Sequence, residues 1–200
     1  MQEPTWYVMI DGQAEALHGA AHAHALLQEG TINAETPCWV ADGRLLAGAH
    51  PRLGPYAVGD RLDVLLEAGV RHFVDLTLPG EAGEYAWELD LRADALGENV
   101  TYARHPLPPR RGPMDAAAVR AILGRVDDCL RSDGITYLHG RDPMRRPGMI
   151  VGCLMVQRGQ SPEVALNWLE TRNWRSGGRL ETRPLNQEQQ DFVRSWTPRS

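Results

Sequence analysis

The sequence predicts an α/β fold, in which a central, mostly parallel sheet is flanked by helices and preceded by a small N-terminal extension. Short apolar segments alternate with segments of helical periodicity, an order that is typical of parallel strands joined by crossover helices. Late in the chain, a strand-like segment leads through a loop rich in glycine, proline and arginine into a long apolar segment. The length of 200 residues suits one domain with a small addition.

Residues 1–37 differ from the rest of the chain and are predicted to form the extension. Residues 6–10 predict a short strand that ends at the turn pair Asp11-Gly12, and the alanine-rich residues 14–28 predict a helix. The segment is faintly similar to small bacterial GYF-type adaptor domains, and an extension that covers part of the core is an equal alternative. That similarity is carried by Trp6, Tyr7, Gly12, Leu27, Gly30, Ile32, Thr36 and Trp39.

His18 and His22 are four residues apart and would share one face of the predicted N-terminal helix, a spacing that metal sites use. No acidic or thiol partner lies near them in the sequence. We therefore expect solvent-facing histidines, no metal site and no cofactor.

Residues 38–200 carry the regular alternation. The predicted elements are a strand after Trp39, helices at 60–68, 84–96 and 115–130, and strands at 70–78 and 99–104. Residues 105–113 contain four prolines and are predicted to be irregular, because proline removes backbone donors. Ser161-Pro162 has the composition of a helix start, and residues 186–196 predict a final helix.

The stretch that organises the chain lies between these elements. Residues 135–139 predict a central strand and residues 146–158 a helix, joined by the loop that contains Arg141 and Arg145. A strand that runs through a tight loop into a helix directs backbone N–H groups and the positive end of the helix dipole at one point. The arrangement favours an anion.

This stretch resembles the signature loop of the cysteine-dependent protein tyrosine and dual-specificity phosphatases. That family has His-Cys, five residues, then Arg and Ser or Thr followed by Gly. Here His139 and Gly148 match, and Arg146 stands six positions after Gly140, which replaces the family's cysteine. The resemblance covers residues 38–200 and extends to Arg44-Leu-Leu-Ala-Gly48 and to Gln189, Phe192, Val193 and Trp196, which are similar to segments of bacterial members.

The resemblance implies a phosphatase fold but a damaged catalytic site. In the family a cysteine thiolate attacks phosphorus and an aspartic acid on a separate loop protonates the leaving group. Gly140 has no side chain to attack, and Pro109 stands where similar bacterial proteins have the acid. Pro143 and Pro147 also remove N–H donors from the loop. No catalytic residue is therefore expected, and the anion-binding candidates are Arg146, Arg141, Arg145, His139 and Gly148.

These observations predict a pseudophosphatase, a domain that binds or scaffolds phosphorylated or acidic peptides or small anions. The alternative is a divergent phosphoester hydrolase that uses a water nucleophile. A protein altered only at residue 140 is disfavoured, because the prolines also depart from the family pattern.

Composition restricts the partners and the setting. The net charge of −5 argues against nucleic acid as a partner, and no apolar run is long enough for a membrane span. Without a secretory signal the expected location is the cytoplasm. All 21 basic residues are arginine, which suggests a bacterial source, and the sequence does not indicate an oligomeric state.

Overall fold

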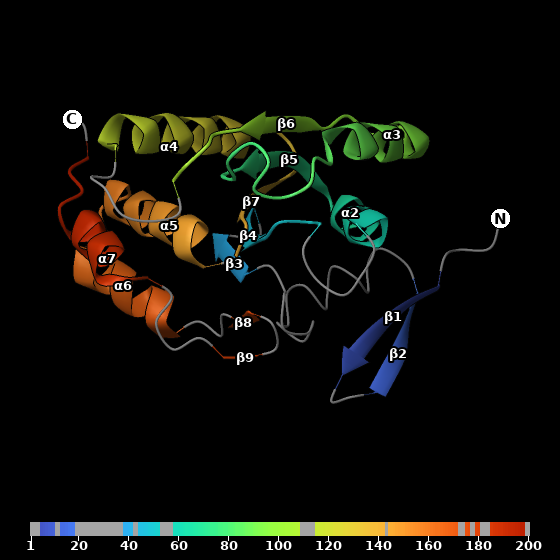
Figure 1. Cartoon of the computed structure of the whole chain (residues 1–200), viewed down its shortest axis with the longest axis horizontal. Coiled ribbons are helices and arrows are strands. Elements are labelled where there is room, and N and C mark those ends of the chain that lie inside the picture. The colour runs from blue at the N-terminus through green and yellow to red at the C-terminus, as the bar shows by residue number, and fades with distance from the viewer. Residues whose placement is uncertain are drawn as a thin grey trace.

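The computed structural model describes residues 5–10, 13–18, 38–41, 44–52, 58–108, 115–142, 144–171, 175–176, 179–180 and 185–198. Strands and helices alternate over most of this length, as Figure 1 shows. The strands are β1 (Thr5–Ile10), β2 (Gln13–His18), β3 (Cys38–Ala41), β4 (Leu45–Ala49), β5 (Val70–Asp75), β6 (Thr101–Arg104), β7 (Ile135–Gly140), β8 (Arg175–Ser176) and β9 (Arg179–Leu180). The helices are α2 (Val58–Glu67), α3 (Ala86–Leu96), α4 (Ala116–Arg131), α5 (Arg145–Gln157), α6 (Pro162–Thr171) and α7 (Gln187–Arg194).

The main sheet has five strands in the order β3-β4-β7-β5-β6. Strand β3 is antiparallel to β4, whereas β4, β7, β5 and β6 run parallel to their neighbours. Strand β7 is central and is paired along its length, Leu138 opposite both Ala47 of β4 and Val74 of β5. The predicted α/β class with a mostly parallel central sheet is confirmed.

Two apolar layers cover the two faces of this sheet. Alternate residues of each central strand point to opposite sides, so that Leu138 and Val74 belong to one core cluster and Tyr137 and Phe73 to the other. The first cluster is closed by α4, α5, α6 and α7, and the second by α2 and α3. Figure 1 shows α5, α6 and α7 grouped together, away from α2 and α3. Because helices cover both faces of the sheet, the central strands are nearly continuous apolar runs in the sequence.

The N-terminal prediction is half right. β1 confirms the predicted strand, but the structure forms β2 over residues 13–18, where a helix was expected, and pairs it antiparallel with β1. The register places Ile10 opposite Gln13, so two residues separate the strands. The predicted turn at Asp11-Gly12 lies outside the described residues. The hydrogen-bonded pairing with β1 outweighs the helix propensity of alanine. His18 lies in a strand, so the helical-face argument for His18 and His22 does not apply, and residues 19–37 lie outside the described residues.

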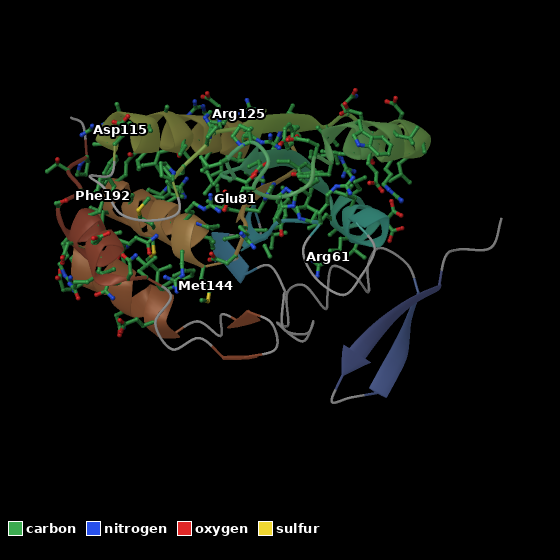
Figure 2. The ribbon with its side chains drawn as sticks, in the orientation of Figure 1. Arg61, Glu81, Asp115, Arg125, Met144 and Phe192 are labelled. Atoms are coloured by element: carbon green, nitrogen blue, oxygen red, sulfur yellow. The ribbon has the colours of Figure 1, made fainter. Side chains whose placement is uncertain are left out.

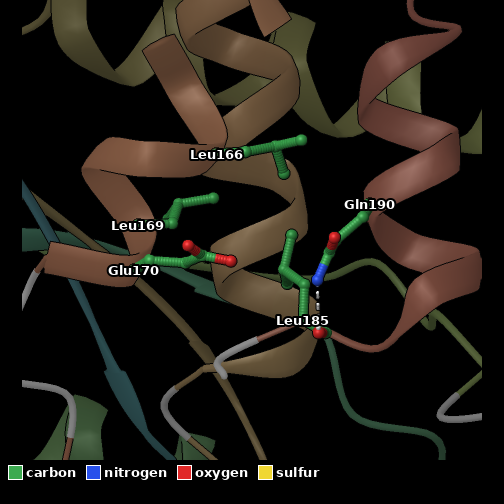
Figure 3. A pocket seen from close by; sticks show the side chains of 5 residues that line it. All are labelled: Leu166, Leu169, Glu170, Leu185 and Gln190. Carbon is green, nitrogen blue, oxygen red and sulfur yellow. Dashed lines mark hydrogen bonds between the residues drawn. The ribbon is translucent and has the colours of Figure 1, made fainter. Parts of the chain in front are cut away.

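The C-terminal helices begin where the sequence predicts. Ser161 Oγ accepts from the N–H of Val164 at the start of α6, and Asn186 and Gln189 form a capping box at the start of α7. Between α6 and α7 lies a small hollow that is too narrow to admit a water molecule (Figure 3). Its lining includes Leu185, whose carbonyl accepts from Gln190 Nε2 at 3.1 Å, and includes no residue of the loop after β7. Among the described residues, none of the helices is both long and apolar enough to span a bilayer.

Candidate functional site

The loop between β7 and α5 lies at the carboxyl edge of the parallel strands, where ligands bind in open α/β sheets. Strand β7 ends at Gly140 and α5 begins at Arg145, so four residues separate them. The predicted strand and helix are confirmed to within one residue at each end. The amino end of α5 is thereby placed beside the end of the central strand.

Gly140 ends β7 and is the residue at which the sequence resemblance predicts the family's cysteine. It is not one of the glycines with positive φ, so its backbone conformation is open to any residue. A Cβ built there would lie 3.2 Å from Pro147 Cδ and 3.5 Å from Arg146 Nε. A side chain at residue 140 would therefore lie close to the Arg146 guanidinium, and glycine has no side chain to place there.

The Asp142 carboxylate already occupies donors at the start of α5. Its Oδ1 accepts from the N–H of Met144 at 3.1 Å and from the N–H of Arg145 at 2.8 Å. These N–H groups belong to the positive end of the helix, which an external anion would otherwise use. Asp142 thus occupies some of the N–H donors that the loop would otherwise offer to a ligand.

Arg146 is held by a second internal carboxylate. Its guanidinium donates through Nη1 to Glu81 Oε2 at 2.7 Å and through Nη2 to Glu81 Oε1 at 2.5 Å. Nη1 also lies 3.0 Å from the carbonyl oxygens of Leu76 and Leu107, and the Arg146 side chain is only 2% exposed. Figure 2 shows Glu81 near the amino end of α5.

The pKa of Glu81 reflects this contact with Arg146. Burial alone would raise the pKa of Glu81, but hydrogen bonds from Arg146 and from the N–H of Leu78 outweigh burial and lower it. The Glu81 carboxylate is therefore ionised near neutral pH. Arg146 lies in the interior as half of a bidentate ion pair.

Comparison with known proteins gives structural matches alone, since no family model and no curated protein matches the sequence. Tk-PTP in its active form aligns with a TM-score of 0.60 at 20% identity, over 80% of this chain and 95% of its own. The core catalytic domain of the PP-IP phosphatase SIW14 from S. cerevisiae, in complex with citrate, aligns with a TM-score of 0.60 at 14% identity, over 83% of this chain and 88% of its own. P. aeruginosa TpbA in complex with pTyr aligns with a TM-score of 0.57 at 16% identity, over 81% and 90%.

The chain has the fold of the protein tyrosine and dual-specificity phosphatases. Within this phosphatase-like fold, the loop after β7 occupies the place that the sequence resemblance predicts for the signature loop. The similarity at 14–20% identity concerns the fold, whereas the chemistry of the loop depends on its own residues.

The other candidate residues of the phosphatase-like loop lie in two environments. Arg141 is exposed and Arg145 is half-buried, and the structure gives neither guanidinium an acceptor among the described residues. The His139 ring is fully buried and does not reach the loop surface. Gly148 faces inward, where a Cβ would lie 3.4 Å from Leu185 Cδ2, so its small size serves helix packing. Pro109 and Pro143 lie outside the described residues.

Beneath the loop the phosphatase-like fold buries a polar cluster around Asp75. Asp75 Oδ1 accepts from the N–H and hydroxyl of Thr77, and Oδ2 accepts from Tyr102 Oη at 2.7 Å and Arg104 Nε at 3.1 Å. Burial alone would raise the pKa of Asp75, but the nearby His139 ring and the hydrogen bonds from Tyr102 and Thr77 hold it at about 2. Asp75 is therefore ionised in the core.

Two histidines complete the cluster in their neutral form. Burial lowers the pKa of His50 to about 4 and that of His139 to about 3, in spite of the nearby Asp75 carboxylate. His139 Nε2 lies 2.6 Å from the hydroxyl of Tyr85, which is itself buried. The rings of His50 and His139 meet edge to face at 5.3 Å.

Sequence reasoning missed Glu81, Asp75 and His50. A signal for Asp75 was available, because a carboxylate that ends an apolar strand lies at the ligand edge of a parallel sheet. Glu81 follows the same strand after a turn, but its pairing with Arg146 joins residues 65 positions apart in sequence. That pairing depends on the fold.

Proposed function

We propose that the chain is a pseudophosphatase, a phosphatase-like domain that binds phosphorylated or acidic ligands without hydrolysing them. The observation that carries the proposal is Gly140 at the end of β7, beside the amino end of α5 and Arg146. Covalent catalysis needs an activated nucleophile at that point, and glycine supplies none. In a serine protease, removal of the covalent nucleophile costs about 10⁶ in kcat.

The nearby residues support the same proposal. Pro109 stands where the resembling family has its general acid, a contribution worth roughly 10²–10⁴ in rate. The thiols of Cys129 and Cys153 are buried in the core, and burial raises the pKa of Cys153 to about 12. Neither thiol is a substitute nucleophile, because the thiolate is the reactive form.

The contacts that a ligand can make are those with donors that no internal carboxylate occupies. Asp142 and Glu81 already hold the start of α5 and Arg146, so an external anion competes with carboxylates at both. Arg141 and Arg145 have no internal acceptor among the described residues and are the first contacts that we expect an anion to make. The fold neighbours that contain pTyr or citrate make phosphoryl and carboxylate groups the natural ligand class.

The test combines binding with hydrolysis. A fluorescent phosphotyrosine peptide should bind the chain and should bind more weakly as salt rises, since exposed charges are screened. Replacing both Arg141 and Arg145 by alanine should weaken binding about tenfold. Each exposed contact contributes up to about 1 kcal/mol. Their sum reaches the range of the ~1.4 kcal/mol that equals a factor of ten in affinity. The matched control is Arg131→Ala, which removes an exposed arginine on α4 and should leave binding unchanged.

Two results would overturn the proposal. Catalytic release of phosphate from the peptide would support a hydrolase that uses water as its nucleophile. Absence of binding at millimolar peptide would show that phosphorylated peptides are not ligands of the chain.

A further inference from the structure

The buried cluster beneath the loop brings together three side chains that metal ions use. His50 follows β4, Asp75 ends β5 and His139 lies one residue before the end of β7, so all three meet at the carboxyl edge of the parallel strands. One ligand atom from each residue lies within 4.8 Å of the others. All three residues have 0% exposure.

Each histidine has one occupied and one unpartnered ring nitrogen in the described part of the chain. His50 Nδ1 accepts from the N–H of Arg52 at 3.2 Å, and His139 Nε2 pairs with Tyr85 Oη at 2.6 Å. His50 Nε2 and His139 Nδ1 are buried without a hydrogen-bond partner. A buried polar atom without a partner is costly, and two of the seven such atoms in the described residues occur on these neighbouring rings beside a carboxylate.

The contact that orients the His139 ring is of the kind that surrounds a metal ligand. A metal-bound histidine typically uses its other ring nitrogen to hydrogen bond a neighbouring group, which fixes the ring orientation. Tyr85 does this for His139, whose free Nδ1 lies 3.8 Å from Asp75 Oδ1. The free nitrogen and the carboxylate oxygen are therefore held on the same side of the cluster.

The charge balance of the cluster favours a cation. Arg104 contacts Asp75, but it also forms a two-pronged pair with Glu84, in which both N···O distances are 2.7 Å. Arg146 has its own carboxylate partner in Glu81. Because Glu84 and Glu81 compensate the two arginines, the negative charge of Asp75 remains beside two neutral imidazoles.

We propose that His50, Asp75 and His139 bind a first-row divalent metal ion such as Zn²⁺, which ties the ends of β4, β5 and β7 together beneath the loop. Neutral imidazole and carboxylate are the ligands that zinc takes, at about 2.0–2.2 Å, and three protein ligands leave one tetrahedral position for a fourth. Closing the site requires the three side chains to move inward, since two ligand atoms of one tetrahedral zinc ion lie about 3.3–3.6 Å apart.

Binding has two local consequences. Coordination through Nε2 moves the His50 proton to Nδ1, so that ring gives up its 3.2 Å hydrogen bond from the N–H of Arg52. At Asp75 Oδ1 the ion replaces the Thr77 hydroxyl, while the N–H of Thr77 keeps its contact at 2.8 Å. This site is separate from the anion site proposed above, and neither proposal depends on the other.

The experiment uses the full chain with His18, His22 and His24 replaced by glutamine, so that histidines of the extension cannot bind the probe. After treatment with a chelator, Zn²⁺ titration by calorimetry should give one equivalent bound, and Co²⁺ should give the visible absorption of a tetrahedral site. His50→Phe keeps an aromatic ring against Tyr85 and His139 and should weaken zinc binding at least tenfold, as should Asp75→Asn. His105→Gln, outside the cluster, is the matched control and should bind like the parent.

Zinc binding that is equal in the parent and in both cluster variants would overturn the proposal, and so would no binding at millimolar Zn²⁺. Circular dichroism of each variant verifies that it is folded. His50→Phe removes a ligand while preserving ring packing, so the test holds even where Asp75→Asn fails to fold.

Discussion

Replacing Glu81 by alanine should destabilise the chain strongly, because it leaves the Arg146 guanidinium buried without its carboxylate. Arg146 is 2% exposed and Glu81 12% exposed, so water cannot readily take the place of the lost partner. The carbonyls of Leu76 and Leu107 would remain at 3.0 Å, but they do not neutralise the charge. Breaking a buried ion pair by removing one partner costs about 3–5 kcal/mol, a large part of the ~5–15 kcal/mol that stabilises a typical domain.

The assay is urea unfolding of the parent chain, Glu81→Ala and a matched control. Glu98→Ala removes the partner of Arg71 in a pair whose side chains are 20% and 40% exposed, so it should cost less than about 1 kcal/mol. Inorganic phosphate should stabilise Glu81→Ala more than it stabilises the parent or Glu98→Ala, because only Glu81→Ala also frees Arg146 for an external anion. A loss below about 1 kcal/mol, or equal losses in the two variants, would refute the description of Arg146 as internally paired.

Four further predictions follow from the loop and the core. Gly140→Cys should give little turnover of a phosphotyrosine peptide in a phosphate-release assay, because Pro109 stands where we expect the family's general acid; turnover approaching that of an active phosphatase would contradict this. Glu81 keeps its carboxylate ionised to a lower pH in the folded than in the unfolded chain, so its stabilisation is present above the usual pKa of 4.5 and is lost as the pH falls below it. Below pH 4.5 the unfolding free energy of the parent should therefore fall more steeply than that of Glu81→Gln, and parallel curves would oppose the assignment. Asp142→Ala should cost about 0.5–1.5 kcal/mol and raise phosphate affinity in calorimetry, because it removes the acceptor of two N–H groups at the start of α5. Asp115→Ala, which removes the N-cap of α4, should cost stability alone. Cys153 should resist alkylation at pH 8 in the native chain, since burial raises its pKa to about 12, and rapid labelling under native conditions would show that the core opens.

The fold was largely predictable because its signals are local. Apolar runs such as that of β7, helix starts such as Ser161-Pro162 and the glycine-rich loop all fall within a few residues of the elements that they define. The helix that was wrongly predicted near the N-terminus also came from a local signal. Alanine-rich residues 13–18 have high helix propensity, but the neighbouring strand supplies a ladder that propensity does not describe.

The candidate site was predictable in position and less so in detail. The spacing from His139 to Gly148 located the loop between β7 and α5. It could not show that Arg146 turns to Glu81, because that contact joins distant segments and depends on the depth at which the guanidinium is buried. His139 was expected near the anion, but the alternation of side chains along β7 directs its ring into the core.

The central claim is that the chain holds a phosphorylated ligand without cleaving it. The most direct measurement is phosphorus NMR of a phosphotyrosine peptide incubated with an equal amount of the chain. We expect the peptide signal to shift on binding, to return when salt is added, and to lose no intensity to inorganic phosphate over many hours. Growth of an inorganic phosphate signal that is absent from a peptide-only sample, or a peptide signal that the chain leaves unshifted, would contradict the account.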